Sequence, residues 1–149
     1  MPDLTVQCSP DGPLVHVDIS PSTHYQLANF PKGSPAPVIQ ALFLVDTGAS
    51  HCMIDEPILA PLKLTPRSGA FVRSAATGKQ QLKRPRYDLS LLLYDQNPAR
   101  GWFHGSVSVT AAEPNSFDGA LYRGIIGRNV LDLGVLFYDG PNKQFRLTW

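Results

Sequence analysis

The sequence lacks the features that mark several whole classes of protein. Its 149 residues carry 13 Lys and Arg against 12 Asp and Glu, so the formal net charge is only +1. This near-neutral balance gives no strong field for steering nucleic acid or acidic lipid to the surface. No apolar run approaches the roughly 20 residues that a membrane-spanning helix needs. Pro2, Asp3 and Pro10 interrupt the place where a signal peptide would lie. We therefore expect a cytoplasmic protein, or a domain of a longer one, without a nucleic-acid partner or membrane segment.

Cysteine and histidine are also scarce. Two cysteines, Cys8 and Cys52, are too few for a disulfide framework or a zinc knuckle. The four histidines have no ligand spacing such as His-x-x-x-His, so the sequence predicts neither a metal site nor a cofactor. Cys52 follows His51 directly, but neighbours on one strand point to opposite faces, which argues against a nucleophilic pair. Cys52 is expected to be a small buried core residue.

Proline and glycine, by contrast, are frequent. Fourteen prolines and 12 glycines in a chain with few helical patterns favour many short strands joined by turns. Charged residues are 17% and hydrophobic residues 43% of the chain, which argues against disorder. The length predicts one ordinary domain over residues 1–149. We expect N-terminal strands and a loop over 1–37 and a core over 38–149.

The local patterns predict most elements of this domain. Strands at 4–8 and 14–20 are expected to form a hairpin, and residues 21–37 are expected to be a loop because they are rich in proline. A buried strand is expected at 38–46. The remaining expected elements are strands at 51–54, 87–95, 102–112 and 125–126, an exposed hairpin over 71–86 with its tip near Gly78, short helices at 58–62 and 128–133, and a closing hairpin of 135–138 and 143–149.

The strand over 38–46 ends in the triplet Asp46-Thr47-Gly48. A carboxylate at the end of a buried strand is unfavourable unless it is hydrogen-bonded or used in chemistry. Peptide hydrolysis by carboxylates needs two of them close together, sharing one proton. The chain has no second such triplet, since Asp118-Gly119-Ala120 lacks the hydroxyl residue. Two copies of the chain, related by a twofold axis, would bring two triplets together. Taken alone, the triplet is most often only a hydrogen-bonded turn.

The triplet does not stand alone. The run from Ala41 to Ser50 and the later segment Gly124-Ile125-Ile126-Gly127-Arg128-Asn129 together resemble the active-site signature of the retropepsins. These are the aspartic proteases of retroviruses and their cellular and bacterial relatives. The resemblance is specific at 41–54 and 124–139, and looser but correctly ordered over 38–149. It implies an all-β acid-protease fold: a single lobe with one or two short helices, a closed barrel-like core and a flap hairpin.

The resemblance also implies a function and a site. The chain would be an aspartic endopeptidase that acts on peptide or protein substrates as a homodimer, with Asp46, Thr47 and Gly48 as the catalytic turn. The Thr47 hydroxyl would hydrogen-bond across the twofold axis, and Gly127 would allow a close backbone approach beneath the turn. The residues expected to contact substrate are Leu44, Ala49, Ser50, Ala76, Thr77, Gly78 and Ile125.

Two departures from the retroviral pattern leave questions open. Retroviral enzymes usually have an acidic residue where Ser50 stands, and it pairs with the arginine equivalent to Arg128; here Arg128 must find another partner. The flap candidate has one glycine where viral flaps have several. The same sequence is compatible with a non-catalytic dimerisation or peptide-binding module of the same fold. It is also compatible with a protomer that is monomeric when isolated.

Overall fold

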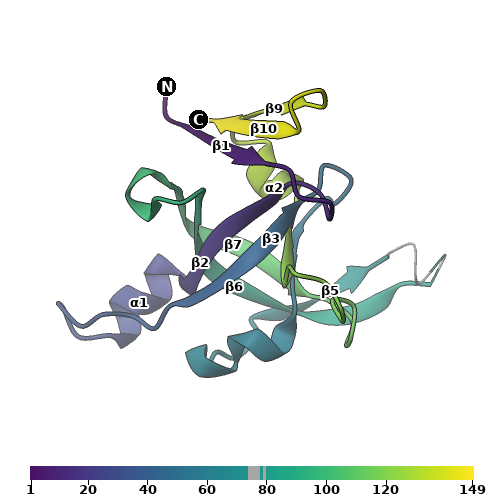
Figure 1. The fold of residues 1–149 in the computed structure, drawn as a ribbon. Helices are drawn as coiled ribbons and strands as arrows, with labels where there is room; N and C mark the ends of the chain where they lie inside the picture. The colour runs from purple at the N-terminus through teal and green to yellow at the C-terminus, as the bar shows by residue number, and fades with distance from the viewer. Residues whose placement is uncertain (74–77, 79) are drawn as a thin grey trace.

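The computed structural model describes residues 1–73, 78 and 80–149 (Figure 1). The strands are β1 (Asp3–Gln7), β2 (Leu14–Pro21), β3 (Ile39–Val45), β4 (Cys52–Ile54), β5 (Ser68–Val72), β6 (Leu82–Tyr94), β7 (Trp102–Ala111), β8 (Gly124–Ile126), β9 (Val135–Asp139) and β10 (Gln144–Thr148). The helical segments are α1 (Thr23–Asn29), η1 (Glu56–Leu62), η2 (Pro98–Arg100) and α2 (Arg128–Leu131). No helix among these residues is long and apolar enough to cross a membrane.

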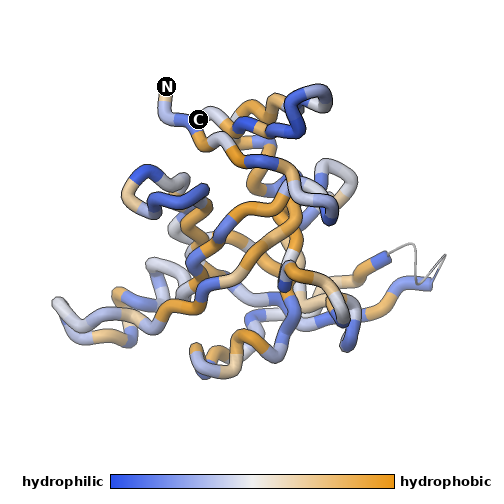
Figure 2. The backbone as a smooth tube through the Cα atoms, viewed as in Figure 1, coloured by the Kyte–Doolittle hydropathy of each residue, from blue (hydrophilic) through white to orange (hydrophobic). Residues whose placement is uncertain are grey.

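A closed barrel forms the centre of the described structure. Its strands follow the order β2-β3-β8-β4-β7-β6, and β2 also pairs with β6, which closes the ring. β5 extends this sheet as an edge strand on β6. Side chains of β2 and β6 alternate into the core, and Figure 2 shows apolar segments running along the central strands while polar ones gather in the loops. This confirms the expected all-β class with a barrel-like core and short helices.

A second sheet, in the order β1-β10-β9, contains both chain ends and lies at the end of the barrel where β3 finishes (Figure 1). The buried side chains of Leu4, Phe145 and Leu147 form its inner face.

The expectation of an N-terminal hairpin is wrong, although both of its strands exist. β1 pairs with β10, whereas β2 pairs with β3 and β6. The tight turn itself forms, with a bridge between Ser9 and Gly12, but the strands separate beyond it because the strongly apolar β2 is buried inside the barrel.

The expected loop over 21–37 contains a helix. α1 begins after Ser22, whose side-chain oxygen accepts a hydrogen bond from the backbone N–H of Tyr25 at 3.3 Å, and it ends at Phe30, one residue before Pro31. None of the residues of α1 is buried, so the segment has no apolar face that a helical period could reveal. The signals that could have found it are the serine cap and the proline-free stretch between Pro21 and Pro31.

β5 and β6 form the expected hairpin, with Ser68 opposite Arg86 and Val72 opposite Leu82. Its second arm is continuous with the strand expected at 87–95, so both belong to the single long strand β6. Gly78 is exposed and has a φ of +60°, a backbone conformation that favours glycine. Ala76 and Thr77, expected at the tip, lie outside the described residues.

Candidate active site

Asp46 lies where β3 leaves the barrel. β3 and β8 run parallel, with Leu44 opposite Ile125, and the Asp46 N–H donates to the carbonyl of Ile126 at 3.0 Å. The chain then turns so that the Gly48 N–H donates to Oδ1 of Asp46 at 2.8 Å. A Cβ at position 48 would lie 3.0 Å from that same oxygen, so glycine keeps the amide close to the carboxylate. The turn thus fixes the orientation of one carboxylate at the mouth of the barrel.

Gly127 supports this turn from below. A Cβ on Gly127 would lie 2.5 Å from both the carbonyl carbon and the carbonyl oxygen of His51, and 3.0 Å from the oxygen of Ala49. Side chains do not tolerate such distances, so position 127 requires glycine for the two backbones to touch. The Arg128 N–H donates to the carbonyl of Ala49 at 2.9 Å, which joins the same two segments. The expected close backbone approach is therefore present.

Arg128 has a partner within its own chain. Its Nη1 donates to the carbonyl oxygen of Thr47 at 2.8 Å. This contact uses a backbone carbonyl and needs no acidic side chain. It is therefore compatible with Ser50 at the position where retroviral enzymes have an acidic residue. Ser50 is exposed, and its hydroxyl lies 3.0 Å from Nδ1 of His51. Arg128 therefore holds the Asp46 turn through its backbone, and the side chains of Thr47 and Ser50 remain on the surface.

Asn129 and Cys52 join the turn to the barrel, and sequence reasoning gave Asn129 no role. The Asn129 Oδ1 accepts from the Cys52 N–H at 2.8 Å, and its Nδ2 donates to the carbonyl of Ser108 at 3.0 Å. The Gly127 N–H points at the Cys52 sulfur at 3.4 Å. Burial raises the pKa of the Cys52 thiol to about 11, although the Gly127 N–H opposes this shift. Cys52 is thus a buried, protonated core residue, as expected.

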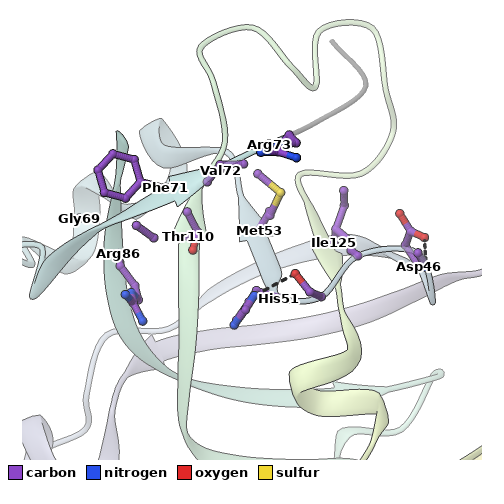
Figure 3. Close-up of a pocket in the computed structure, with 14 residues that line it drawn as sticks. Asp46, His51, Met53, Gly69, Phe71, Val72, Arg73, Arg86, Thr110 and Ile125 are labelled. Atoms are coloured by element: carbon purple, nitrogen blue, oxygen red, sulfur yellow. Dashed lines mark hydrogen bonds between the residues drawn. The ribbon is translucent and has the colours of Figure 1, made fainter. Parts of the chain in front are cut away.

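A cavity of about 740 Å³ opens between the Asp46 turn and the β5–β6 hairpin (Figure 3). Its lining residues are Asp46, Gly48, Ala49, Ser50, His51, Met53, Gly69, Ala70, Phe71, Val72, Arg73, Arg86, Thr110 and Ile125. The structure thus brings Ala49, Ser50 and Ile125 into one wall with Asp46. Leu44 and Gly78 do not line the cavity; Leu44 pairs with Leu14 and contacts Gly12. The basic character of 71–86 is visible in the sequence, but sequence reasoning treated its charges as solvated and did not assign this wall, formed by β5 and β6, to the site.

The site offers one carboxylate and no arrangement for a metal. Among the described residues, no three His, Cys, Asp or Glu side chains come together as a possible metal site. Asp46 is the only acidic residue of the cavity wall in the part of the chain that the structure describes. A single carboxylate can act as a base on water, but it leaves the substrate carbonyl without an acid partner. One chain therefore supplies one carboxylate to this cavity.

Comparison with known proteins agrees with this geometry. The family model for aspartyl protease matches residues 36–130, a range that includes the Asp46 turn and the Gly127 segment. The chain belongs to this aspartyl protease family. No curated protein matches the sequence.

Two solved structures share the fold. One is a retropepsin-like aspartic protease from Rickettsia conorii, 14% identical with a TM-score of 0.57, over 97% of this chain and 89% of that chain. The other is an aspartic proteinase from Irpex lacteus, 16% identical with a TM-score of 0.51, over 98% of this chain and 46% of that chain. This chain thus has the retropepsin-like acid-protease fold, and it spans about half the length of the Irpex lacteus enzyme.

Proposed function

We propose that this chain is an aspartic endopeptidase that acts as a homodimer, with one Asp46 carboxylate from each protomer. The observation that carries the proposal is the turn itself: a family-typical Asp-Thr-Gly at the end of β3, with the Gly48 N–H bound to Asp46 and the carboxylate facing a large cavity. The match to 89% of the Rickettsia conorii chain supports a single-lobe unit.

Two facing carboxylates would divide the chemistry between them. The ionised Asp46 takes a proton from water while the oxygen of that water attacks the carbonyl carbon of the peptide bond. The protonated Asp46 of the partner subunit hydrogen-bonds the carbonyl oxygen, on which negative charge develops. As the C–N bond breaks, the Asp46 that took the proton from water gives it to the leaving amine nitrogen, while the partner's Asp46 keeps its own proton, so the pair returns to its singly protonated state. Thr47, exposed beside Asp46, would hydrogen-bond across the twofold axis.

The sheet beside the turn is the surface that we propose for the dimer contact. β10 is paired on both sides, so within the described residues a second copy can add only at the edges β1 or β9 or on the outer face. β9 exposes large apolar side chains, with Val135 62%, Phe137 56% and Tyr138 62% exposed. Apolar exposure of this kind, next to a half-complete site, favours association of two copies through this end of the molecule.

Substrate would bind as an extended strand between the hairpin and the floor of the cavity. Among the described residues, β5 pairs with β6 alone, so one of its edges offers backbone groups to a peptide. Ala49, Ser50 and Ile125 would contact the peptide near the scissile bond. Leu44 and the hairpin residues Ala76, Thr77 and Gly78 are proposed as further contacts that form when the hairpin closes over substrate.

The substitution Asp46→Asn tests this function. It removes the titrating carboxylate but keeps the shape of the side chain and its ability to accept from Gly48. We expect kcat/KM on a peptide library to fall by at least about a thousandfold, with the dimer unchanged in sedimentation. The matched control Asp118→Asn changes an exposed aspartate outside the turn and should keep activity. Two results together would favour the peptide-binding or dimerisation module instead. The wild-type chain would cleave no peptide, and its biological activity would survive Asp46→Asn.

A further inference from the structure

The wall of the cavity opposite Asp46 is basic. Arg86 on β6 lies in this wall, and Arg73, just after β5, lines the cavity nearer its middle. Asp46 is the only carboxylate that lines the cavity among the described residues. Figure 3 places Arg86 and Asp46 at opposite ends of the cavity, with Thr110, Met53 and Ile125 between them. The cavity therefore has a positive end that is separate from the proposed catalytic end.

The neighbouring Arg84 and Arg67 have partners, whereas Arg86 has no ion-pair partner among the residues that the structure describes. Arg84 lies 3.5 Å from a carboxylate oxygen of Glu56 and donates to the carbonyl of Ala112 at 2.7 Å. Arg67 pairs with Asp88 at 2.7 Å. Among the described residues, Arg86 forms no ion pair, and its buried Nε has no hydrogen-bond partner. Residues 74–77 and 79 contain no Asp or Glu that could supply one.

A buried N–H donor without an acceptor is unfavourable, and most such groups in proteins are paired. The guanidinium group matches a carboxylate well, because two parallel N–H donors can bind its two oxygens. A carboxylate entering this end of the cavity would satisfy Arg86. Bound there, the carboxylate would also lie at the opposite end of the cavity from Asp46, so the negative charge of Asp46 would repel it little.

We propose that Arg86 selects substrates that carry an acidic side chain, Asp or Glu, on one side of the cleaved bond. This inference rests on the proposed endopeptidase function and names its substrate class. The extended peptide would run from the Asp46 turn along β5, so that its acidic side chain reaches Arg86 while the scissile bond lies at the carboxylates.

The test begins with a degenerate peptide mixture, whose cleavage products are sequenced by mass spectrometry. Asp and Glu should be enriched at one position near the cleaved bond. Peptides with Glu, Gln or Lys at that position are then compared one by one. Since hydrogen bonds to charged groups are worth more than neutral ones, the change from Glu to Gln should lower kcat/KM by about 10- to 100-fold.

A charge swap assigns the preference to Arg86. The variant Arg86→Glu should cleave the Lys peptide better than the Glu peptide, a gain that a misfolded enzyme would not show. The matched control is Arg67→Glu, which makes the same charge change on an exposed residue outside this cavity and should keep the wild-type preference. Equal cleavage of all three peptides, or a preference unchanged in Arg86→Glu, would overturn the inference and leave the endopeptidase proposal standing. Cleavage of no peptide at all would overturn both.

Discussion

At the scale of single residues, the site depends on contacts that are too close for ordinary side chains. Gly48 brings its N–H to 2.8 Å from the Asp46 carboxylate, and Gly127 lets the backbones at 127 and 51 touch. Arg128 binds the Thr47 carbonyl from beneath. These residues hold Asp46 in one orientation before substrate arrives, which is what a pair of carboxylates acting together requires.

His104 on β7 makes the stability of the fold depend on pH. Its ring packs against Trp102, with ring centroids 4.4 Å apart, and its buried Nε2 has no hydrogen-bond partner in the described part of the chain. Burial lowers the pKa of this imidazole from its ordinary value of 6.5, because desolvation disfavours the charged form. The unfolded chain then binds more protons than the folded chain once the pH falls below that value. His104 therefore stabilises the fold above the ordinary pKa, and this stabilisation is lost on acidification.

We expect His104→Phe to flatten this pH dependence. Phenylalanine keeps an aromatic contact with Trp102 and does not titrate. Free energies of unfolding from urea titrations at pH 7.5 and 5.5 should fall less in the variant than in the wild type. His24→Phe, at an exposed histidine on α1, should retain the wild-type difference. An equal loss of stability in wild type and His104→Phe would contradict this assignment.

At the scale of elements, the Asn129 side chain ties α2 to two barrel strands, while Val130 and Leu131 of the same helix are buried in the core. Asn129 accepts from the backbone of β4 and donates to the backbone of β7. Asn129→Ala would leave the N–H of the fully buried Cys52 and the carbonyl of Ser108 without these partners. We expect a loss of about 2 to 4 kcal/mol in the free energy of unfolding, since each lost partner costs about 1 to 3 kcal/mol.

The matched control for this substitution is Asn29→Ala. The Asn29 side chain donates to a carbonyl at an exposed position in α1, so its removal leaves groups that water can satisfy. It should lower stability by less than about 1 kcal/mol. Urea denaturation of both variants makes the comparison, and a similar loss in the two would show that Asn129 does not join α2 to the barrel.

Strands and turns that have a local sequence pattern could be predicted from the sequence, whereas the pairing of strands far apart in the chain could not. The apolar run ending at Asp46, the Ile125-Ile126 strand and the hairpin arms around Gly78 all lie where expected. The pairing of β1 with β10 joins opposite ends of the chain, so no local pattern reveals it. α1 was missed because none of its residues is buried.

In the site, the Asp-Thr-Gly motif identified the turn at Asp46. Arg86, by contrast, reaches the cavity wall only through the pairing register of β5, β6 and β7, which no local pattern reveals.

At the scale of the whole molecule, the proposed chemistry needs two chains. One chain has a closed barrel, a buried core cluster and a single Asp-Thr-Gly, so under the proposed mechanism it would supply only one of the two carboxylates. The exposed apolar side chains of β9 lie on the terminal sheet, at the end of the barrel where β3 finishes. Assembly would then switch on activity, and cleavage should depend on protein concentration near the dimer dissociation constant.

Mixing wild-type chains with Asp46→Asn chains tests this requirement most directly. The total concentration is held fixed, and sedimentation verifies that the mixture has exchanged subunits and is dimeric. If each active site needs both carboxylates, cleavage should fall with the square of the wild-type fraction, to about one quarter in an equal mixture. Asp118→Asn chains used as the diluent should cause no fall. A linear fall, to about one half, would mean that each chain works with its own Asp46 alone and would contradict the account.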